Sequence, residues 1–180
     1  MTAQIPPIVK ISELFQAGIV VRDAEKGMKL YGNMFGITSW TVFTIDRNLC
    51  QLTYRGQPSQ HSFKAAMAMV GPLMIELLQP LEGYGTYREF LEKHGEGIHH
   101  LGHIIVPDLD SVLGKMAKAG FPTVETGEPL GSPKGGHKWG YVDTSPALGY
   151  VLEFSQGTDP RDTLKMFQRR PRPTRQEDPV

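Results

Sequence analysis

The sequence has little cysteine, no excess of either charge and no long apolar run. Cys50 is the only cysteine among 180 residues, which excludes an intrachain disulfide framework and favours a reducing compartment. The 19 basic and 19 acidic side chains cancel, and this balance argues against a nucleic-acid partner, because nucleic-acid-binding proteins normally carry a basic excess. Residues 1–7 lack the basic and apolar regions of a signal peptide, and no stretch approaches the roughly 18 apolar residues of a membrane-spanning helix. We therefore expect a cytoplasmic protein that binds neither nucleic acid nor membranes.

Strand and helix patterns occur in the same order in the two halves of the chain. The expected strands cover 14–21, 40–45, 63–70 and 73–79 in the first half, and 98–106, 122–125, 138–142 and 150–155 in the second. After the first strand of each half, Asp23 or Asp110 is a suitable N-cap for a helix that ends at Gly36 or Gly120. The order β-α-β-β-β occurs twice, which predicts an α+β fold of two paired βαβββ modules.

Further segments lie outside these elements. Thr86 and Glu89 form a capping-box pattern that predicts a short helix closed by Gly95, and Asp159 with Pro160 predicts a last helix. The polar segment 47–62 is expected to be a loop. We place an N-terminal arm at 1–11, the first module at 12–81, a linker with the short helix at 82–96, the second module at 97–157, and a C-terminal helix and flexible tail at 158–180.

Matching polar residues stand in the matching strands of the two halves. Gln16-Ala17-Gly18 and His100-Leu101-Gly102 open the first strand of each half, and Glu76 and Glu153 interrupt the apolar last strands. A carboxylate inside such a strand is costly unless it is paired or binds a metal. A strand glutamate that faces solvent is the alternative at either position taken alone. One amide, one imidazole and two carboxylates together suit a divalent cation with room left for water or substrate oxygens.

On these residues, and on the segment from Phe90 to His100, the chain resembles the vicinal oxygen chelate superfamily, which includes glyoxalase I and methylmalonyl-CoA epimerase. The resemblance implies a cleft between paired modules, with one metal ligand on the first and last strand of each. The implied ligands of one divalent metal ion are Gln16, Glu76, His100 and Glu153. Glutamine at the first position, often histidine in bacterial members, is the pattern of the eukaryotic-type zinc glyoxalase I. Zinc is therefore expected, with manganese, cobalt or nickel as alternatives.

Strand parity and loop position separate the other candidate residues. If His100 faces the cleft, His99 and His103 point to the opposite side and are expected to be hydrogen-bonded core or edge residues. We expect His61 in a solvated loop and His94 at a helix end, and we leave His137 open. Lys134 and Lys138 lie in a glycine-rich stretch that is either a flexible hairpin or a flap whose lysines meet a ligand phosphate or carboxylate. We therefore regard both lysines as candidate substrate-binding residues.

The resemblance implies a metal-dependent isomerase, epimerase or lyase that acts through an enediolate. The metal would hold two substrate oxygens, and Glu153 and Glu76, one from each module, would be the catalytic bases. The expected substrate is a small acyl-CoA or another enolisable acid such as a 2-oxo compound, as in methylmalonyl-CoA epimerase. A glyoxalase I-type lactoylglutathione lyase is the first alternative, although no counterparts of its glutathione-holding residues are found at Val20, Pro80 and Glu96.

Two further alternatives come from other functional classes. An extradiol-type dioxygenase would need two histidine ligands, whereas one of the four ligand positions is histidine here. A bleomycin-resistance-type binding protein would use the cleft without catalysis. We also expect a homodimer, because open sheet edges call for a cover that the arm and the tail of a neighbouring chain would supply.

Overall fold

In the computed structural model, the described part of the chain comprises residues 7–133 and 135–157. Its helices and strands follow one another as β1 Gln16–Val20, α1 Ala24–Phe35, β2 Thr41–Ile45, β3 Cys50–Tyr54, β4 Gln57–Ser59, β5 Phe63–Val70, β6 Leu73–Pro80, α2 Thr86–His94, β7 Gly97–Ile105, α3 Leu109–Lys118, β8 Thr123–Pro129, β9 Lys138–Val142, α4 Ser145–Leu148 and β10 Val151–Gln156. The last helix expected from Asp159 and the C-terminal tail lie outside the described residues. No helix in the described ranges is long and apolar enough to cross a membrane.

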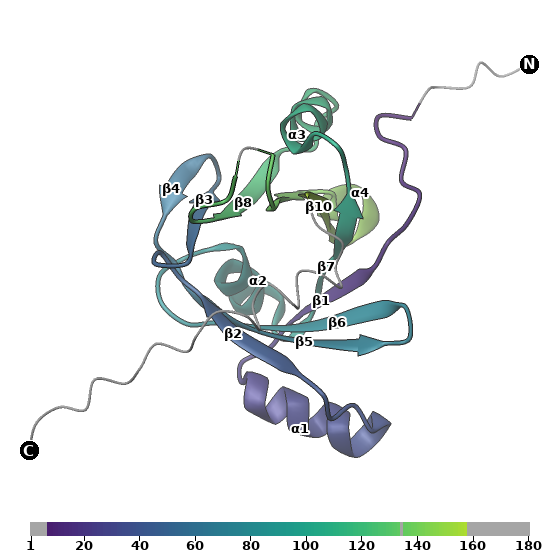
Figure 1. Cartoon of the computed structure of the whole chain (residues 1–180), viewed down its shortest axis with the longest axis vertical. Helices are drawn as coiled ribbons and strands as arrows, with labels where there is room; N and C mark the ends of the chain where they lie inside the picture. The colour runs from purple at the N-terminus through teal and green to yellow at the C-terminus, as the bar shows by residue number, and fades with distance from the viewer. Residues whose placement is uncertain (1–6, 134, 158–180) are drawn as a thin grey trace, which may run out of the picture.

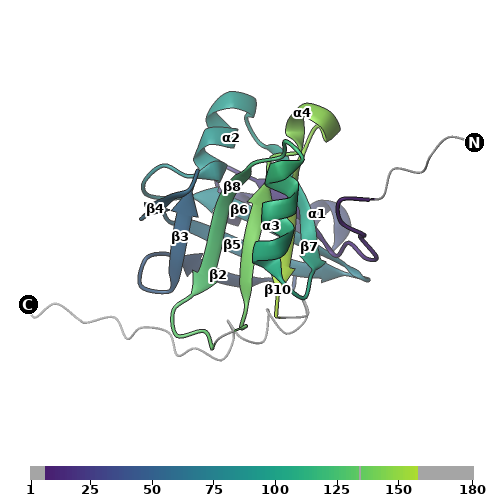
Figure 2. The ribbon, with the colours of Figure 1, turned by 90° about the horizontal axis from the view of Figure 1, so that it is seen from above.

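The strands form one mixed sheet that curls into a half-barrel (Figure 1). Its strand order is β2-β5-β6-β1-β7-β10-β9-β8-β3-β4. The prediction of two βαβββ modules is confirmed: β1 pairs in parallel with β6, β7 pairs in parallel with β10, and the antiparallel pair β1–β7 joins the two halves. Helices α1 and α3 cover the outside of the half-barrel, while α2 and α4 lie at one of its ends (Figures 1 and 2).

The segment 47–62 is not a plain loop, because it contains the hairpin β3–β4, which pairs with the edge strand β8 of the second module. Arg55 and Gly56 form its two-residue turn with φ angles of 49° and 77°. Two positive φ angles in succession are the mark of a type I′ turn, for which Asn-Gly rather than Arg-Gly is the usual signal. The strands are short and polar, so the period-2 pattern was too weak to predict them.

Two of the predicted helix starts are wrong and one is confirmed. Asp23 caps α1 through a hydrogen bond from the Lys26 N–H, and Gly36 ends the helix in the left-handed conformation. Helix α3 is capped by Asp108 instead of Asp110. Helix α2 begins after Gly85 without a side-chain cap, so the capping box of Thr86 and Glu89 does not form.

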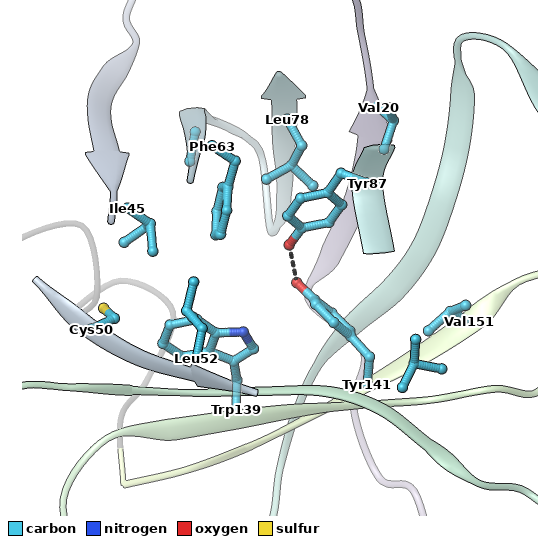
Figure 3. Packing of buried hydrophobic residues seen from close by; sticks show 12 residues of the cluster. Val20, Ile45, Cys50, Leu52, Phe63, Leu78, Tyr87, Trp139, Tyr141 and Val151 are labelled. Atoms are coloured by element: carbon cyan, nitrogen blue, oxygen red, sulfur yellow. Dashed lines mark hydrogen bonds between the residues drawn. The ribbon is translucent and has the colours of Figure 1, made fainter. Parts of the chain in front are cut away.

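The largest buried cluster lies inside the half-barrel and draws side chains from both modules (Figure 3). Phe63 and Leu78 come from the first module, Trp139 and Tyr141 come from the second, and Tyr87 reaches in from α2. The hydroxyls of Tyr87 and Tyr141 lie 2.6 Å apart and form a hydrogen bond inside this cluster (Figure 3). The interior of the sheet is therefore one core that holds the two modules and α2 together.

Removing one hydroxyl of this buried pair should cost more than removing an exposed one. We expect Tyr87→Phe to lower the free energy of unfolding by about 1–3 kcal/mol, because the Tyr141 hydroxyl is left without its partner in the core. The double variant with Tyr141→Phe should lose less than the sum of the single variants. Tyr84→Phe, at a tyrosine that is 49% exposed, is the matched control. Urea unfolding compares the parent with these four variants, and strict additivity would show that the two hydroxyls do not interact.

Candidate active site

A cavity of about 40 Å³ opens on the inner face of the half-barrel. Its lining comes from seven strands of the two modules, from the chain just before β9, and from α2. It comprises Gln16, Phe43, Ile45, Phe63, Met67, Glu76, Tyr87, His103, His137, Trp139, Tyr141 and Glu153. A volume of this size holds an ion with a few waters, since one water needs roughly 10–15 Å³ on this kind of measure. The lining thus combines polar side chains with aromatic ones.

The four residues predicted as ligands lie together beside this cavity. They stand on four neighbouring strands, β6, β1, β7 and β10, and each is at most 5% exposed. The Gln16 Nε2 donates to Glu76 Oε2 at 2.8 Å. The His100 Nε2 lies 3.3 Å from Glu153 Oε2 and 3.6 Å from Glu76 Oε2. The sequence alone had predicted this set of residues, and the fold brings them into contact.

Three buried atoms of this set find no hydrogen-bond partner among the described residues: Gln16 Oε1, His100 Nε2 and Glu153 Oε2. An unsatisfied buried polar atom costs about 1–3 kcal/mol, so three of them in one place need a common explanation. An amide oxygen, an imidazole nitrogen and a carboxylate oxygen are the atoms through which these side chains bind metal ions. No group of three His, Cys, Asp or Glu side chains in residues 7–133 and 135–157 has a ready metal-binding arrangement, but the unsatisfied donor atoms fit a divalent cation.

The two carboxyl groups of the site differ in their tendency to ionise. Burial, and then the charge of Glu153, raise the pKa of Glu76 well above its ordinary value. Burial also acts to raise the pKa of Glu153, but the contact with His100 and the charges of His100, His103 and His137 outweigh it, and the pKa is lowered. Two neighbouring carboxyl groups with pKa values shifted apart form the kind of pair that acid–base catalysis uses.

Two glycines make room for the site. A Cβ on Gly18 would lie 1.9 Å from His100 Cε1, and a Cβ on Gly102 would lie 2.4 Å from Glu153 Oε2. Each of these glycines follows a predicted ligand by two positions and clears space for the ligand on the next strand. The repeated pattern of Gln16 to Gly18 and His100 to Gly102 therefore has a packing reason.

Two histidines of the cavity were not predicted. His103 lines the cavity, so the prediction from strand parity that its side chain points to the opposite side is wrong. The residue has a φ of 57°, and β7 gains one residue against β10 at this point, a bulge that reverses the facing of the side chain. His137 stacks on His103 with ring centroids 6.1 Å apart and lies on the same side as Trp139 and Tyr141. Counting back by twos from those aromatics would have found His137, whereas no sequence signal marks the bulge.

The remaining candidates lie elsewhere. His99 is a buried, hydrogen-bonded core residue as predicted, and burial, followed by the charges of His100 and His94, lowers its pKa well below 6.5. His94 lies in the last turn of α2. His61 is 4% exposed, so its assignment to a solvated loop is wrong.

Of the two predicted lysines, Lys138 is described, and it does not line the cavity. Lys138 bonds Asp110 Oδ2 of α3 at 2.6 Å, on the face of β9 opposite Trp139 and Tyr141. Its predicted substrate-binding role is therefore not supported by its position. Lys134 lies outside the described residues.

Comparison with known proteins places the chain in a broad group. The family model of the Glyoxalase/Bleomycin resistance protein/Dioxygenase superfamily matches residues 15–141. Methylmalonyl-CoA epimerase from Mycobacterium tuberculosis is similar in structure, with a TM-score of 0.55 and 19% identity over 85% of this chain and 93% of that one. No curated protein matches the sequence.

Two further epimerase structures are similar at the level of the fold. A variant of the Streptomyces coelicolor methylmalonyl-CoA epimerase in complex with 2-nitronate-propionyl-CoA gives a TM-score of 0.58 and 16% identity, over 83% of this chain and 96% of that one. A methylmalonyl-CoA epimerase in complex with methylmalonyl-CoA and NH4+ gives the same four values: 0.58, 16%, 83% and 96%. At these identities the likeness shows the fold alone.

The clearance at Gly18 can be tested without a ligand. We expect Gly18→Ala to lower the free energy of unfolding by about 1–3 kcal/mol, because the new methyl group overlaps the His100 ring inside a packed core. Gly114→Ala is the control, since the Cβ there meets nothing within 4 Å. In the middle of α3 it should stabilise the protein by roughly 0.5–1 kcal/mol. Equal stabilities of the parent and Gly18→Ala in urea would contradict the close approach of His100.

Proposed function

The chain belongs to the Glyoxalase/Bleomycin resistance protein/Dioxygenase superfamily, and from this membership we propose that it is a metal-dependent epimerase or isomerase of a small acyl-CoA or similar enolisable acid. The observation that supports this most directly is the buried meeting of Gln16, Glu76, His100 and Glu153 with three unsatisfied donor atoms. Two of the similar epimerases hold acyl-CoA compounds in their structures, which favours this substrate class.

The proposed centre would hold its metal ion through Gln16, Glu76, His100 and Glu153. Two carboxylates, one imidazole and one amide oxygen give a mostly hard, oxygen-rich donor set that suits zinc, manganese, cobalt or nickel. When bound, such an ion supplies a Lewis acid that stabilises negative charge on an enolate oxygen. The hydrogen bond from Gln16 Nε2 to Glu76 Oε2 orients both side chains toward this position.

The protein itself supplies the proton-transfer groups in this proposal. Glu76 comes from the last strand of the first module and Glu153 from the last strand of the second. Epimerisation needs a carboxylate on one side of the acidic carbon to remove its proton and a protonated carboxyl group on the other side to donate one, and the opposite pKa shifts of Glu153 and Glu76 fit these two roles. Both side chains are at most 5% exposed, so bulk water is kept from the carbanion-like intermediate.

A glyoxalase I-type lyase is the second candidate, because glutamine in the first ligand position is its pattern. The place where a glutathione-holding residue is expected is taken by Glu96, whose carboxylate accepts a hydrogen bond from the Arg22 N–H at 2.7 Å. The hemithioacetal of methylglyoxal and glutathione is the substrate that distinguishes this candidate from an acyl-CoA epimerase.

The metal proposal predicts a stoichiometry. Purified protein should contain about one divalent metal ion per chain, and Glu76→Ala and His100→Ala should both lose it while remaining folded. Gln16→His should keep the ion, since imidazole is also a good ligand. His94→Ala changes a histidine outside the site and is the control. Elemental analysis of the folded variants decides the matter, and full metal content in both alanine variants at the site would disprove the proposal.

The base role of Glu153 predicts a loss of exchange without loss of metal. Glu153→Gln should retain the ion but slow deuterium wash-in at the acidic carbon of an acyl-CoA or 2-oxo substrate by roughly 10²–10⁴-fold, as is typical of a positioned general base. Glu128→Gln, at an exposed glutamate of β8, should exchange at the parent rate. Proton NMR follows the wash-in. If Glu153→Gln exchanges as fast as the parent, the base lies elsewhere.

A further inference from the structure

Two tyrosine hydroxyls meet at the wall of the cavity. Tyr87 and Tyr141 both line it, and each is 2% exposed. Their oxygens lie 2.6 Å apart, within the usual range of a hydrogen bond between two hydroxyls. Figure 3 shows the two side chains reaching toward each other with their hydroxyls at the meeting point. The proton transfer described above involves neither of them.

The pair contains one proton more than its hydrogen bond uses. A tyrosine hydroxyl carries one proton at neutral pH, and its oxygen can also accept a hydrogen bond. The bond between the two oxygens uses one of the two protons, whichever hydroxyl donates it. Within residues 7–133 and 135–157, neither hydroxyl has a second hydrogen-bond partner. One O–H donor of the pair is therefore left over.

The remaining O–H donor is presented to the cavity. Glu76 and Glu153 also line the cavity, but no hydrogen bond joins either carboxyl group to the tyrosine pair: Glu76 Oε2 accepts from Gln16, and Glu153 Oε1 accepts from the Ser155 hydroxyl. The cavity of about 40 Å³ has room for an oxygen atom of a ligand. A fixed, buried donor beside such a space is the arrangement by which enzymes stabilise an oxygen that gains negative charge.

Tyr141 is the member of the pair that stands beside the predicted ligands. It lies directly across from Glu153 in the antiparallel pair β9–β10, and its ring centroid is 4.8 Å from that of His100. The Tyr87 ring packs edge-to-face against Phe63, with the centroids 4.8 Å apart. The left-over donor therefore lies nearest the candidate site when the Tyr87 hydroxyl donates to the Tyr141 oxygen and the Tyr141 O–H points into the cavity.

We propose that Tyr141 is a catalytic residue that donates a hydrogen bond to the substrate oxygen on which negative charge develops, and that Tyr87 is its positioning residue. The identity of that oxygen rests on the proposed function. When Glu153 takes the proton, the C–H electron pair forms the enolate double bond and the carbonyl electrons move onto the oxygen, while Tyr141 keeps its own proton. Because Tyr87 donates to the Tyr141 oxygen, it polarises the Tyr141 O–H and makes it a stronger donor.

The first test is deuterium wash-in at the acidic carbon of an acyl-CoA or 2-oxo substrate. Tyr141→Phe should slow wash-in roughly 10²–10³-fold, as is typical when one donor to such an oxygen is removed. The loss should fall on kcat rather than KM, because the bond is strongest once the charge has formed. Tyr87→Phe keeps the Tyr141 donor and should slow wash-in by less than about 10-fold.

The matched control is Tyr54→Phe. The Tyr54 hydroxyl is also partly buried and donates to Glu89, but the residue does not line the cavity. This variant should exchange at the parent rate. Elemental analysis of all variants should give the metal content of the parent, since no tyrosine is a proposed ligand. Equal losses in Tyr141→Phe and Tyr87→Phe would indicate a packing role for the pair and overturn the proposal.

The second test needs no substrate and follows hydroxyl exchange by NMR of protein labelled with ¹³C at the tyrosine Cζ. In an equal mixture of light and heavy water, a slowly exchanging hydroxyl gives two resolved Cζ signals, and a rapidly exchanging one gives a single averaged signal. Tyr87, whose proton lies between the two oxygens, should give two signals. Tyr141, whose proton faces the cavity, should give one. The spectra of Tyr87→Phe and Tyr141→Phe assign the signals.

The two readouts separate the possible failures. Faster hydroxyl exchange at Tyr87 than at Tyr141 overturns the proposed hydrogen-bond direction in the protein without a ligand. Parent rates of wash-in in Tyr141→Phe overturn its catalytic role. If the parent itself catalyses no wash-in with either substrate class but the hydroxyls exchange as expected, the proposed function and the catalytic role are disproved, and the orientation of the Tyr141 O–H toward the cavity stands.

Discussion

The constraint on which the molecule depends is the burial of two carboxyl groups next to an imidazole inside a β-sheet. Glu76 and Glu153 come from strands on either side of the β1–β7 pair and meet at His100 Nε2. Placing such groups in a core is unfavourable unless each is paired or bound. The fold meets this demand by curling the sheet so that both carboxyl groups face one interior, and by keeping glycine at positions 18 and 102, where a side chain would overlap the site. The cost of burying these groups is what makes the site visible in the sequence.

The repeated order of elements could be predicted because the strands and helices of each module have clear hydrophobic patterns in the sequence. The long apolar strands β5 and β6 and the amphipathic helices α1 and α3 have clear periods and clear end signals, so their positions agree with the predicted ranges within a few residues. The hairpin β3–β4 could not be predicted, since its few residues gain stability by pairing with β8, far away in the sequence. Pairing of this kind depends on the curl of the whole sheet, which cannot be predicted from a local sequence pattern.

The site divides in the same way between local and non-local causes. Polar residues inside apolar strands are a local signal, and they identified Gln16, Glu76, His100 and Glu153. His103 was not predicted to line the cavity, because a bulge reverses the direction of its side chain. The bulge depends on the pairing of β7 with β10. Lys138 alternates with Trp139 along β9 and bonds Asp110 on the outer face, so its position does not support the predicted role in substrate binding.

The predicted capping box at the start of α2 does not form because both of its residues bond partners outside the helix. Thr86 is the type of residue that caps helices, but its hydroxyl bonds His99 instead, and Glu89 bonds Tyr54 and Arg55 of the hairpin. Glu125 takes over at the helix start by accepting the Thr86 N–H from across the half-barrel. A helix that gives up its own cap and receives one from the other module is placed by tertiary contacts rather than by local preference. The hydroxyl of its first residue is thereby left to bond His99, whose ring contacts His100.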